Sequence, residues 1–115
     1  MGARSKKDRF EIKAGIRRDL ARLRKILAES GIEGYRLILF GSHARGEARP
    51  QSDLDLCFVF PDKTAGIDAL RPRIQGISGM NGLNVDVVTT TVTELRKNLV
   101  SPILHEIRKY GLPVD

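Results

Sequence analysis

The stretch that decides the fold is Leu39-Phe40-Gly41-Ser42-His43-Ala44-Arg45-Gly46-Glu47-Ala48-Arg49-Pro50-Gln51-Ser52-Asp53-Leu54-Asp55-Leu56. It starts at the end of one apolar run and closes on two aspartates at the start of another. Asp53 and Asp55 are two residues apart, so on an extended strand their side chains leave the same face. Two such carboxylates repel each other unless a positive charge lies between them. A divalent cation with oxygen ligands meets that need.

Gly41 and Ser42 stand where the first apolar run is expected to turn into a short helix. Backbone N–H groups and a hydroxyl at such a turn suit phosphate oxygens. A plain glycine turn with Ser42 as the helix cap has the same geometry, so it does not compete with this interpretation. A phosphate site beside a pair of metal-binding carboxylates indicates nucleotide chemistry.

This pattern resembles a known signature. Gly-Ser, ten residues and then Asp-x-Asp is similar to the motif of the DNA polymerase beta-like nucleotidyltransferase superfamily, and the fuller pattern resembles its minimal nucleotidyltransferase branch. The matching residues are Gly41, Ser42, Ala44, Arg45, Gly46, Ser52, Asp53, Asp55 and Leu56. The family also has a third acidic residue in a later apolar strand, and Val85-Asp86-Val87-Val88 fits.

The resemblance implies a role for each acidic residue. Asp53 and Asp55 would hold two Mg²⁺ ions, which take a few carboxylates together with water and substrate phosphates. Asp86 would complete the metal site on the acceptor side and help to deprotonate the acceptor hydroxyl. Because Asp86 lies between valines, we expect it on a buried strand, where an unpaired charge is costly. A salt bridge from Asp86 to an arginine is the alternative.

The same resemblance assigns Gly41, Ser42 and Arg45 to the nucleotide's phosphates. Gly41 would let the backbone approach the phosphates, and Ser42 would donate its hydroxyl. Arg45 could instead pair with the aspartates and stabilise the loop. Arg49 occupies a more variable position of the family and has the same two alternatives.

The composition favours one folded domain in a reducing compartment. The chain has 115 residues, 41% of them hydrophobic. We therefore expect a single domain, residues 1–115, with residues 1–7 as a loose N-terminus. No apolar run has the length of a membrane span, and no apolar signal region follows the charged start. Cys57, the only cysteine, cannot form an internal disulfide and suits a packed core, so we expect a cytoplasmic protein.

The net charge of +6 comes from the first part of the chain. Residues 1–30 hold ten Lys or Arg and four Asp or Glu, while the rest of the chain is balanced. Such a basic surface can bind nucleic acid or an acidic partner. A solvated helix face is the more ordinary explanation, and it makes nucleic acid a less favoured partner.

Hydrophobic periodicity and the order of the elements predict one sheet with helices packed on it. The resemblance implies that this is an α/β (α+β) domain with a single small mixed sheet of the nucleotidyltransferase type. The expected helices are residues 8–30, 41–46, 67–77 and two more after 91 and 101, where Thr91 and Ser101 are expected to be N-caps. The expected strands are residues 35–40, 53–60 and 83–89. Pro72 predicts a kink or a break, and Gly76, Gly79 and Gly82 predict a decay into a loop.

The resemblance implies transfer of AMP from ATP, or of another nucleoside monophosphate, to a hydroxyl acceptor. Minimal members of the family are often paired with a helical HEPN partner in toxin–antitoxin systems. Only 29 residues follow Asp86, so we expect a partner or a second subunit to supply the acceptor. The apolar side chains Leu99, Val100, Leu104 and Tyr110 suggest such an interface. The alternatives are a binding module with little activity, transfer to a small molecule such as an aminoglycoside, and transfer to an RNA end.

Overall fold

A computed structural model of the chain describes residues 14–49 and 51–114. Its elements, in chain order, are α2 (Ala14–Glu29), β1 (Arg36–Phe40), α3 (Gly41–Arg45), β2 (Leu54–Phe60), α4 (Ile67–Met80), β3 (Val85–Thr91), α5 (Val92–Lys97), α6 (Pro102–Tyr110) and β4 (Leu112–Pro113). The predictions for residues 1–7 and for the first turns of the first helix lie outside the described residues. Within the described ranges, no helix has the length and apolar character needed to cross a membrane.

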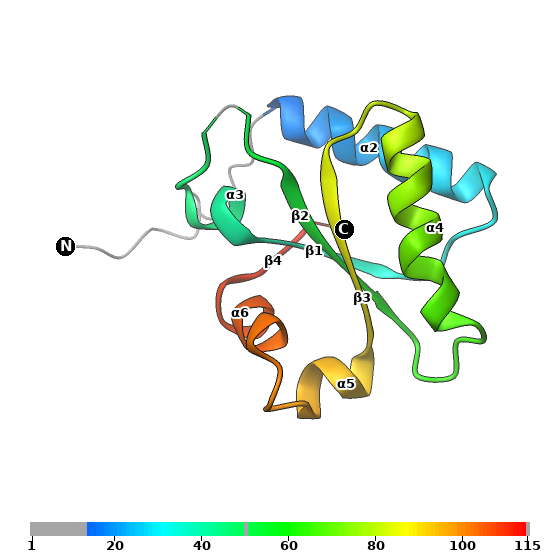
Figure 1. Cartoon of the computed structure of the whole chain (residues 1–115), viewed down its shortest axis with the longest axis vertical. Coiled ribbons are helices and arrows are strands. Elements are labelled where there is room, and N and C mark those ends of the chain that lie inside the picture. The colour runs from blue at the N-terminus through cyan, green and yellow to red at the C-terminus, as the bar shows by residue number, and fades with distance from the viewer. Residues whose placement is uncertain (1–13, 50, 115) are drawn as a thin grey trace.

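The strands form one mixed sheet in the order β3-β2-β1-β4. β1 runs antiparallel to β2 and to β4, while β2 and β3 are parallel (Figure 1). The predicted fold class is therefore confirmed, but the sequence interpretation missed β4. Pro113 of β4 pairs with Ile38 of β1 at the edge of the sheet, where a residue without an N–H is tolerated.

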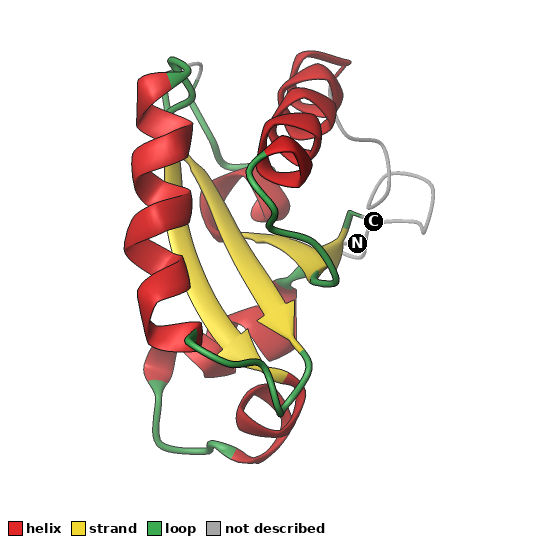
Figure 2. Cartoon of the chain, turned by 90° about the vertical axis from the view of Figure 1, so that its right-hand side faces the viewer, coloured by secondary structure: helices red, strands yellow, loops and turns green. Residues whose placement is uncertain are grey.

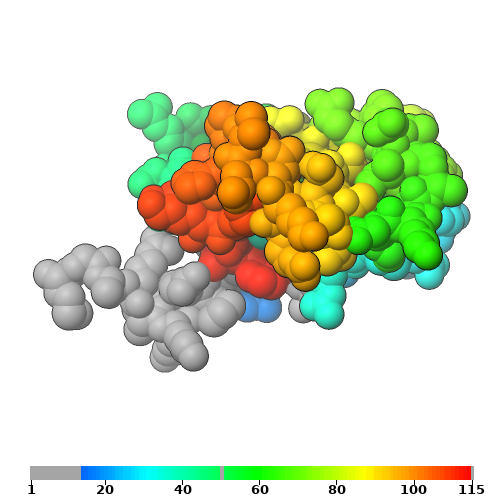
Figure 3. Space-filling model, turned by 90° about the horizontal axis from the view of Figure 1, so that it is seen from below, coloured from blue at the N-terminus to red at the C-terminus, as the bar shows by residue number. Residues whose placement is uncertain are grey.

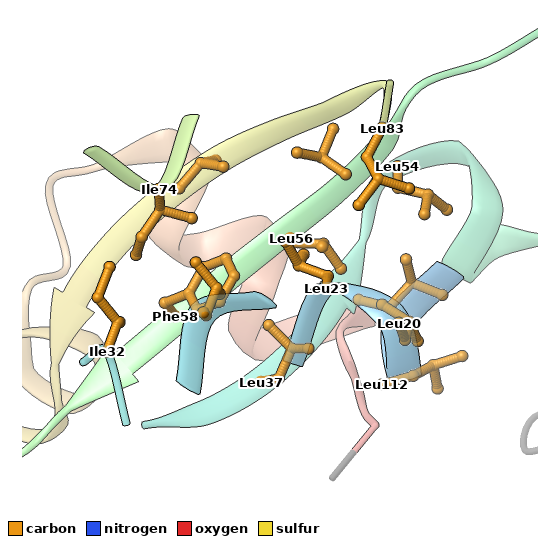
Figure 4. Packing of buried hydrophobic residues seen from close by; sticks show 14 of the residues in the cluster. Leu20, Leu23, Ile32, Leu37, Leu54, Leu56, Phe58, Ile74, Leu83 and Leu112 are labelled. Atoms are coloured by element: carbon orange, nitrogen blue, oxygen red, sulfur yellow. The ribbon is translucent and has the colours of Figure 1, made fainter. Parts of the chain in front are cut away.

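β2 alternates between two hydrophobic cores. Its even-numbered residues, Leu54, Leu56, Phe58 and Phe60, are buried in the larger core with side chains of α2 and α4 (Figure 4). Cys57 and Val59 point to the other face and pack with side chains of α6. Figures 1 and 2 show α2 and α4 on one side of the strands and α5 and α6 grouped at the other end of the molecule. Because side chains alternate along a strand, Asp55 belongs to the α6 face.

The helix predictions need two corrections. Gly76 and Gly79 lie inside α4 instead of ending it, and Pro72 also lies within that helix. The buried Ile74 anchors α4 on the sheet, and this packing outweighs the weak helix propensity of glycine. The chain leaves the helix only after Met80, and Gly82 makes the turn with a φ of 72°.

The predicted caps of the last two helices are confirmed. The hydroxyl of Thr91 accepts a hydrogen bond from the Glu94 N–H, and that of Ser101 accepts one from the Leu104 N–H, both at 3.2 Å. Helical spacing predicts that Ile103 and Ile107 face inward on α6, and this prediction is wrong for Ile103. Leu104 and Ile107 are buried, whereas Ile103 is 44% exposed.

Candidate active site

The corner between β1 and α3 brings the backbone against a carboxylate. α3 begins at Gly41, directly after the last residue of β1, and Gly41 has a φ of 71°. A Cβ built on Gly41 would collide with Oδ2 of Asp55. Both the left-handed backbone and the lack of space therefore require glycine here. The Gly-Ser motif and the first carboxylate of β2 are in contact in the folded chain.

Asp55 and Asp86 are direct partners in the register between β2 and β3. Parallel neighbours at the same register position project from the same face, so both carboxylates lie on the α6 face. Asp55 is half-buried, and this burial raises the pKa of its carboxyl above the ordinary value. The negative charges of Asp86, Glu106 and Asp53 raise the pKa further, while His43 lowers it.

Asp86 itself is exposed, so the expectation that it is buried was wrong. Its valine neighbours, Val85 and Val87, point into the large core, but β3 is an edge strand and Asp86 leaves its other face. The alternative, a salt bridge from Asp86 to an arginine, is not formed within residues 14–49 and 51–114. Exposure leaves this carboxylate accessible to a ligand or to another molecule.

Asp53 is exposed and stands just before β2, which starts at Leu54. In the described ranges, no three His, Cys, Asp or Glu side chains are placed to hold a metal ion by themselves. The structure thus pairs Asp55 with Asp86 and leaves Asp53 at the entrance of the strand. The donor chemistry of this pair fits Mg²⁺, which is commonly bound by one or two carboxylates and completed by water and substrate phosphates.

Arg45 reaches two carboxylates that the sequence interpretation did not consider. Its Nη1 lies 2.6 Å from Oε2 of Glu106, and its Nε lies 3.1 Å from Oε1 of Glu47. The hydrogen bond to Glu47 and the interactions with Glu106 raise the pKa of Arg45, against a smaller opposing effect of burial. The pairing of Arg45 with the aspartates, one of the two alternatives, is therefore not what the structure shows.

Glu106 is the site residue that the sequence did not reveal. It belongs to α6, and no motif marks it; only the packing of α6 against α3 and β1 brings its carboxylate into this region. The one feature of the sequence that could have pointed to Glu106 is its position next to the inward-facing Ile107. Glu106 influences Asp55 as well as Arg45, so it is a fourth carboxylate near the pair.

His43 ties the two halves of the motif together. Its Nε2 lies 2.9 Å from the backbone oxygen of Ser52, the residue before Asp53. Ser42, which precedes His43, is half-buried in the first turn of α3. A pocket of about 500 Å³ borders this segment, and its lining includes His43, Ser52 and the exposed Arg49. That volume is in the range of small-molecule sites.

The fold and the site together define a protein of the nucleotidyltransferase type. The family model of the nucleotidyltransferase domain matches residues 20–110, so the chain belongs to this family. Among curated proteins, none matches the sequence significantly.

Solved structures agree with this family. A candidate minimal nucleotidyltransferase shares 30% identity over 83% of this chain and 91% of its own, with a TM-score of 0.51. A candidate nucleotidyltransferase from Sulfolobus solfataricus has 22% identity, covers 98% of this chain and 89% of its own, and gives a TM-score of 0.59. A toxin–antitoxin structure with AMP-PNP has 22% identity, covers 84% and 70% respectively, and gives a TM-score of 0.54. At 22% identity, the last two support the fold.

Proposed function

We propose that the protein transfers AMP from ATP to a hydroxyl group, with Mg²⁺ held by its acidic residues. The observation that carries the proposal is the pair of register-matched carboxylates, Asp55 and Asp86, of which Asp55 contacts the Gly41 corner. Membership of the nucleotidyltransferase family supports the reaction type. The proposal places the reaction in the cytoplasm, where a buried cysteine such as Cys57 stays reduced.

In this proposal the nucleotide's phosphates lie at the start of α3. Gly41 allows a close approach of the backbone, the Ser42 hydroxyl donates a hydrogen bond, and Arg45 supplies positive charge. Asp53 and Asp55 would hold the metal, with Asp86 on the acceptor side. Bound there, Mg²⁺ would supply the positive charge that offsets the triphosphate and makes the acceptor hydroxyl more acidic.

The exposed Asp86 faces the acceptor. Its carboxylate would accept the proton of the acceptor hydroxyl while the hydroxyl oxygen of the acceptor bonds to the α-phosphorus. The bond from the α-phosphorus to the bridging oxygen breaks, and pyrophosphate leaves with that oxygen. General-base assistance of this kind typically contributes about 10²- to 10⁴-fold to a rate.

The acceptor is proposed to be a hydroxyl on a helical HEPN-type partner, which makes the protein an antitoxin. A structural neighbour is itself a toxin–antitoxin protein crystallised with AMP-PNP. The connection between α5 and α6 offers an apolar surface for a partner, because Leu99 is 80% and Val100 90% exposed. Figure 3 shows these two helices side by side on one face of the molecule. The sequence prediction included Leu104 in this surface, but Leu104 is buried.

An intact mass measurement tests the proposal. The protein is first incubated with labelled ATP, Mg²⁺ and the product of the neighbouring gene. The expected result is an AMP-sized mass increase on the partner, absent with the Asp55→Asn variant. A partner that binds but stays unmodified would instead identify a binding module. Modification of an aminoglycoside or of an RNA 3′ end in parallel reactions would show that the acceptor is wrong while the nucleotide chemistry is right.

A further inference from the structure

The guanidinium of Arg45 is already occupied by acidic groups of the chain itself. Glu106 reaches it across the space between α6 and α3 at 2.6 Å, while Glu47 comes from only two residues along the chain. The two side chains of the longer-range pair are 32% and 35% exposed. The pair is therefore partly open to solvent, which screens and weakens an ion pair, so an anion arriving from solvent can displace Glu106.

Glu106 also acts on the carboxylate pair. Its negative charge lies near enough to Asp55 to disfavour the ionised form of that residue. Asp53 and Asp86 act on Asp55 in the same direction, whereas His43 opposes them. Glu106 therefore contacts the cation that would bind phosphate and also acts electrostatically on a carboxylate that would bind metal. A triphosphate entering this region meets both the occupied Arg45 and an excess of negative charge.

We propose that Glu106 competes with the nucleotide's phosphate for Arg45 and thereby sets the affinity of the site for nucleotide. The inference rests on the proposed function and adds a residue that none of the sequence motifs marks. Phosphate and carboxylate use the same planar donors of the guanidinium. Each nucleotide that binds through Arg45 must therefore break the contact with Glu106, and each departure of product lets it form again.

The sign of the effect distinguishes this role from an ordinary structural one. If Glu106 competes with phosphate, Glu106→Gln removes the competitor, preserves the shape of the side chain and tightens nucleotide binding. Because ion pairs open to solvent are weak, the loss of this competing pair should raise the affinity for the nucleotide by about two- to fivefold. If Glu106 only positions Arg45 or supports α6, the same change leaves affinity unchanged or weakens it.

The test is a double-mutant cycle with Mg²⁺ and AMP-CPP, a non-transferable ATP analogue, measured by calorimetry. The four proteins are the wild type, Glu106→Gln, Arg45→Gln and the double variant. We expect the gain from Glu106→Gln in the wild-type background and its loss in the Arg45→Gln background, since the competed cation is then gone. Glu47→Gln is the matched control, because Glu47 contacts Arg45 at the longer distance of 3.1 Å with a side chain that is 65% exposed, and it should give a smaller gain.

Two results would overturn the inference alone: no gain for Glu106→Gln when the wild type binds the analogue, or an equal gain in the Arg45→Gln background. The second would mean that Glu106 acts through its general field and not through Arg45. A folded wild type that binds no analogue would instead overturn the proposed function along with the inference. Thermal unfolding of each variant establishes that it is folded before the binding data are compared.

Discussion

Asp55 of β2 and Asp86 of β3 stand side by side in a parallel register, with their carboxylates on the same face of the sheet. Among the residues that the structure describes, neither carboxylate has a salt-bridge partner. The folded protein thus holds two like charges together, one of them half-buried. Such an arrangement opposes stability unless a cation binds, and it therefore yields tests in which activity and stability move in opposite directions.

Asp55→Asn should abolish transfer and raise the melting temperature of the metal-free protein by a few degrees at neutral pH. The amide removes the half-buried charge that repels Asp86, Glu106 and Asp53. Asp53→Asn is the matched control: Asp53 is exposed, so it should lose transfer without a comparable gain in stability. Thermal unfolding in the presence of a chelator provides the measurement. Full activity of both variants would refute the roles assigned to them.

The stability gain of Asp55→Asn should depend on pH. The folded-state pKa of Asp55 is raised above its unfolded value, so the folded state binds this proton more tightly. The wild type is then penalised as the pH rises above the ordinary aspartate value near 3.8 and through the raised folded pKa. We expect the difference in melting temperature between the variant and the wild type to be largest at pH 7 and to shrink toward pH 4. A difference that stays constant over this range would contradict the prediction.

Gly41→Ala should remove transfer and destabilise the fold more than the same change at Gly34. Both glycines have a positive φ, 71° and 81°, but only Gly41 has a neighbour within reach of an added Cβ, namely Asp55. The backbone alone should cost about 1–2 kcal/mol at either position, and the collision adds to this at Gly41. Chemical denaturation and transfer assays of both variants provide the comparison. Equal losses at the two sites would argue against a tight contact at the corner.

Cys57 should take no part in the chemistry. It is fully buried between β1 and β3, and burial raises the pKa of its thiol to about 12. The reactive thiolate is therefore scarce at neutral pH. We expect an aromatic disulfide reagent to label Cys57 only in denaturant, and Cys57→Ala to keep transfer while losing about 1 kcal/mol of stability. Rapid labelling of the native protein that also stops transfer would be evidence against this prediction.

The apolar surface at Leu99 and Val100 should be needed for the partner and not for the fold. The double change Leu99→Ser and Val100→Ser should leave the melting temperature nearly unchanged while weakening association with the proposed partner at least tenfold, about 1.4 kcal/mol or more. Met80→Ser is the control, since Met80 is 87% exposed at the end of α4. Sedimentation of each variant with the partner measures the association. Sedimentation of each variant alone detects a homodimer.

The sequence by itself determined the local structure and the chemical type of the site. The run from Leu39 to Leu56 holds a strand, a turn and a strand whose residue types are close in the chain, and local spacing decides which face Asp55 occupies. The inward face of α2 likewise follows from helical periodicity, since Leu20, Leu23 and Leu27 lie on one stripe and all three are buried in the core.

Only the tertiary structure decided which residues from distant segments meet. Strand order places β3 at an edge, which makes Asp86 exposed although its apolar neighbours suggested burial. The pairing of β4 with β1 and the packing of α6 against α3 bring Pro113 to Ile38 and Glu106 to Arg45. These contacts depend on how the cores pack and on which strands become neighbours, and local periodicity contains neither. For that reason the carboxylates of the motif could be predicted, whereas the carboxylate that holds Arg45 could not.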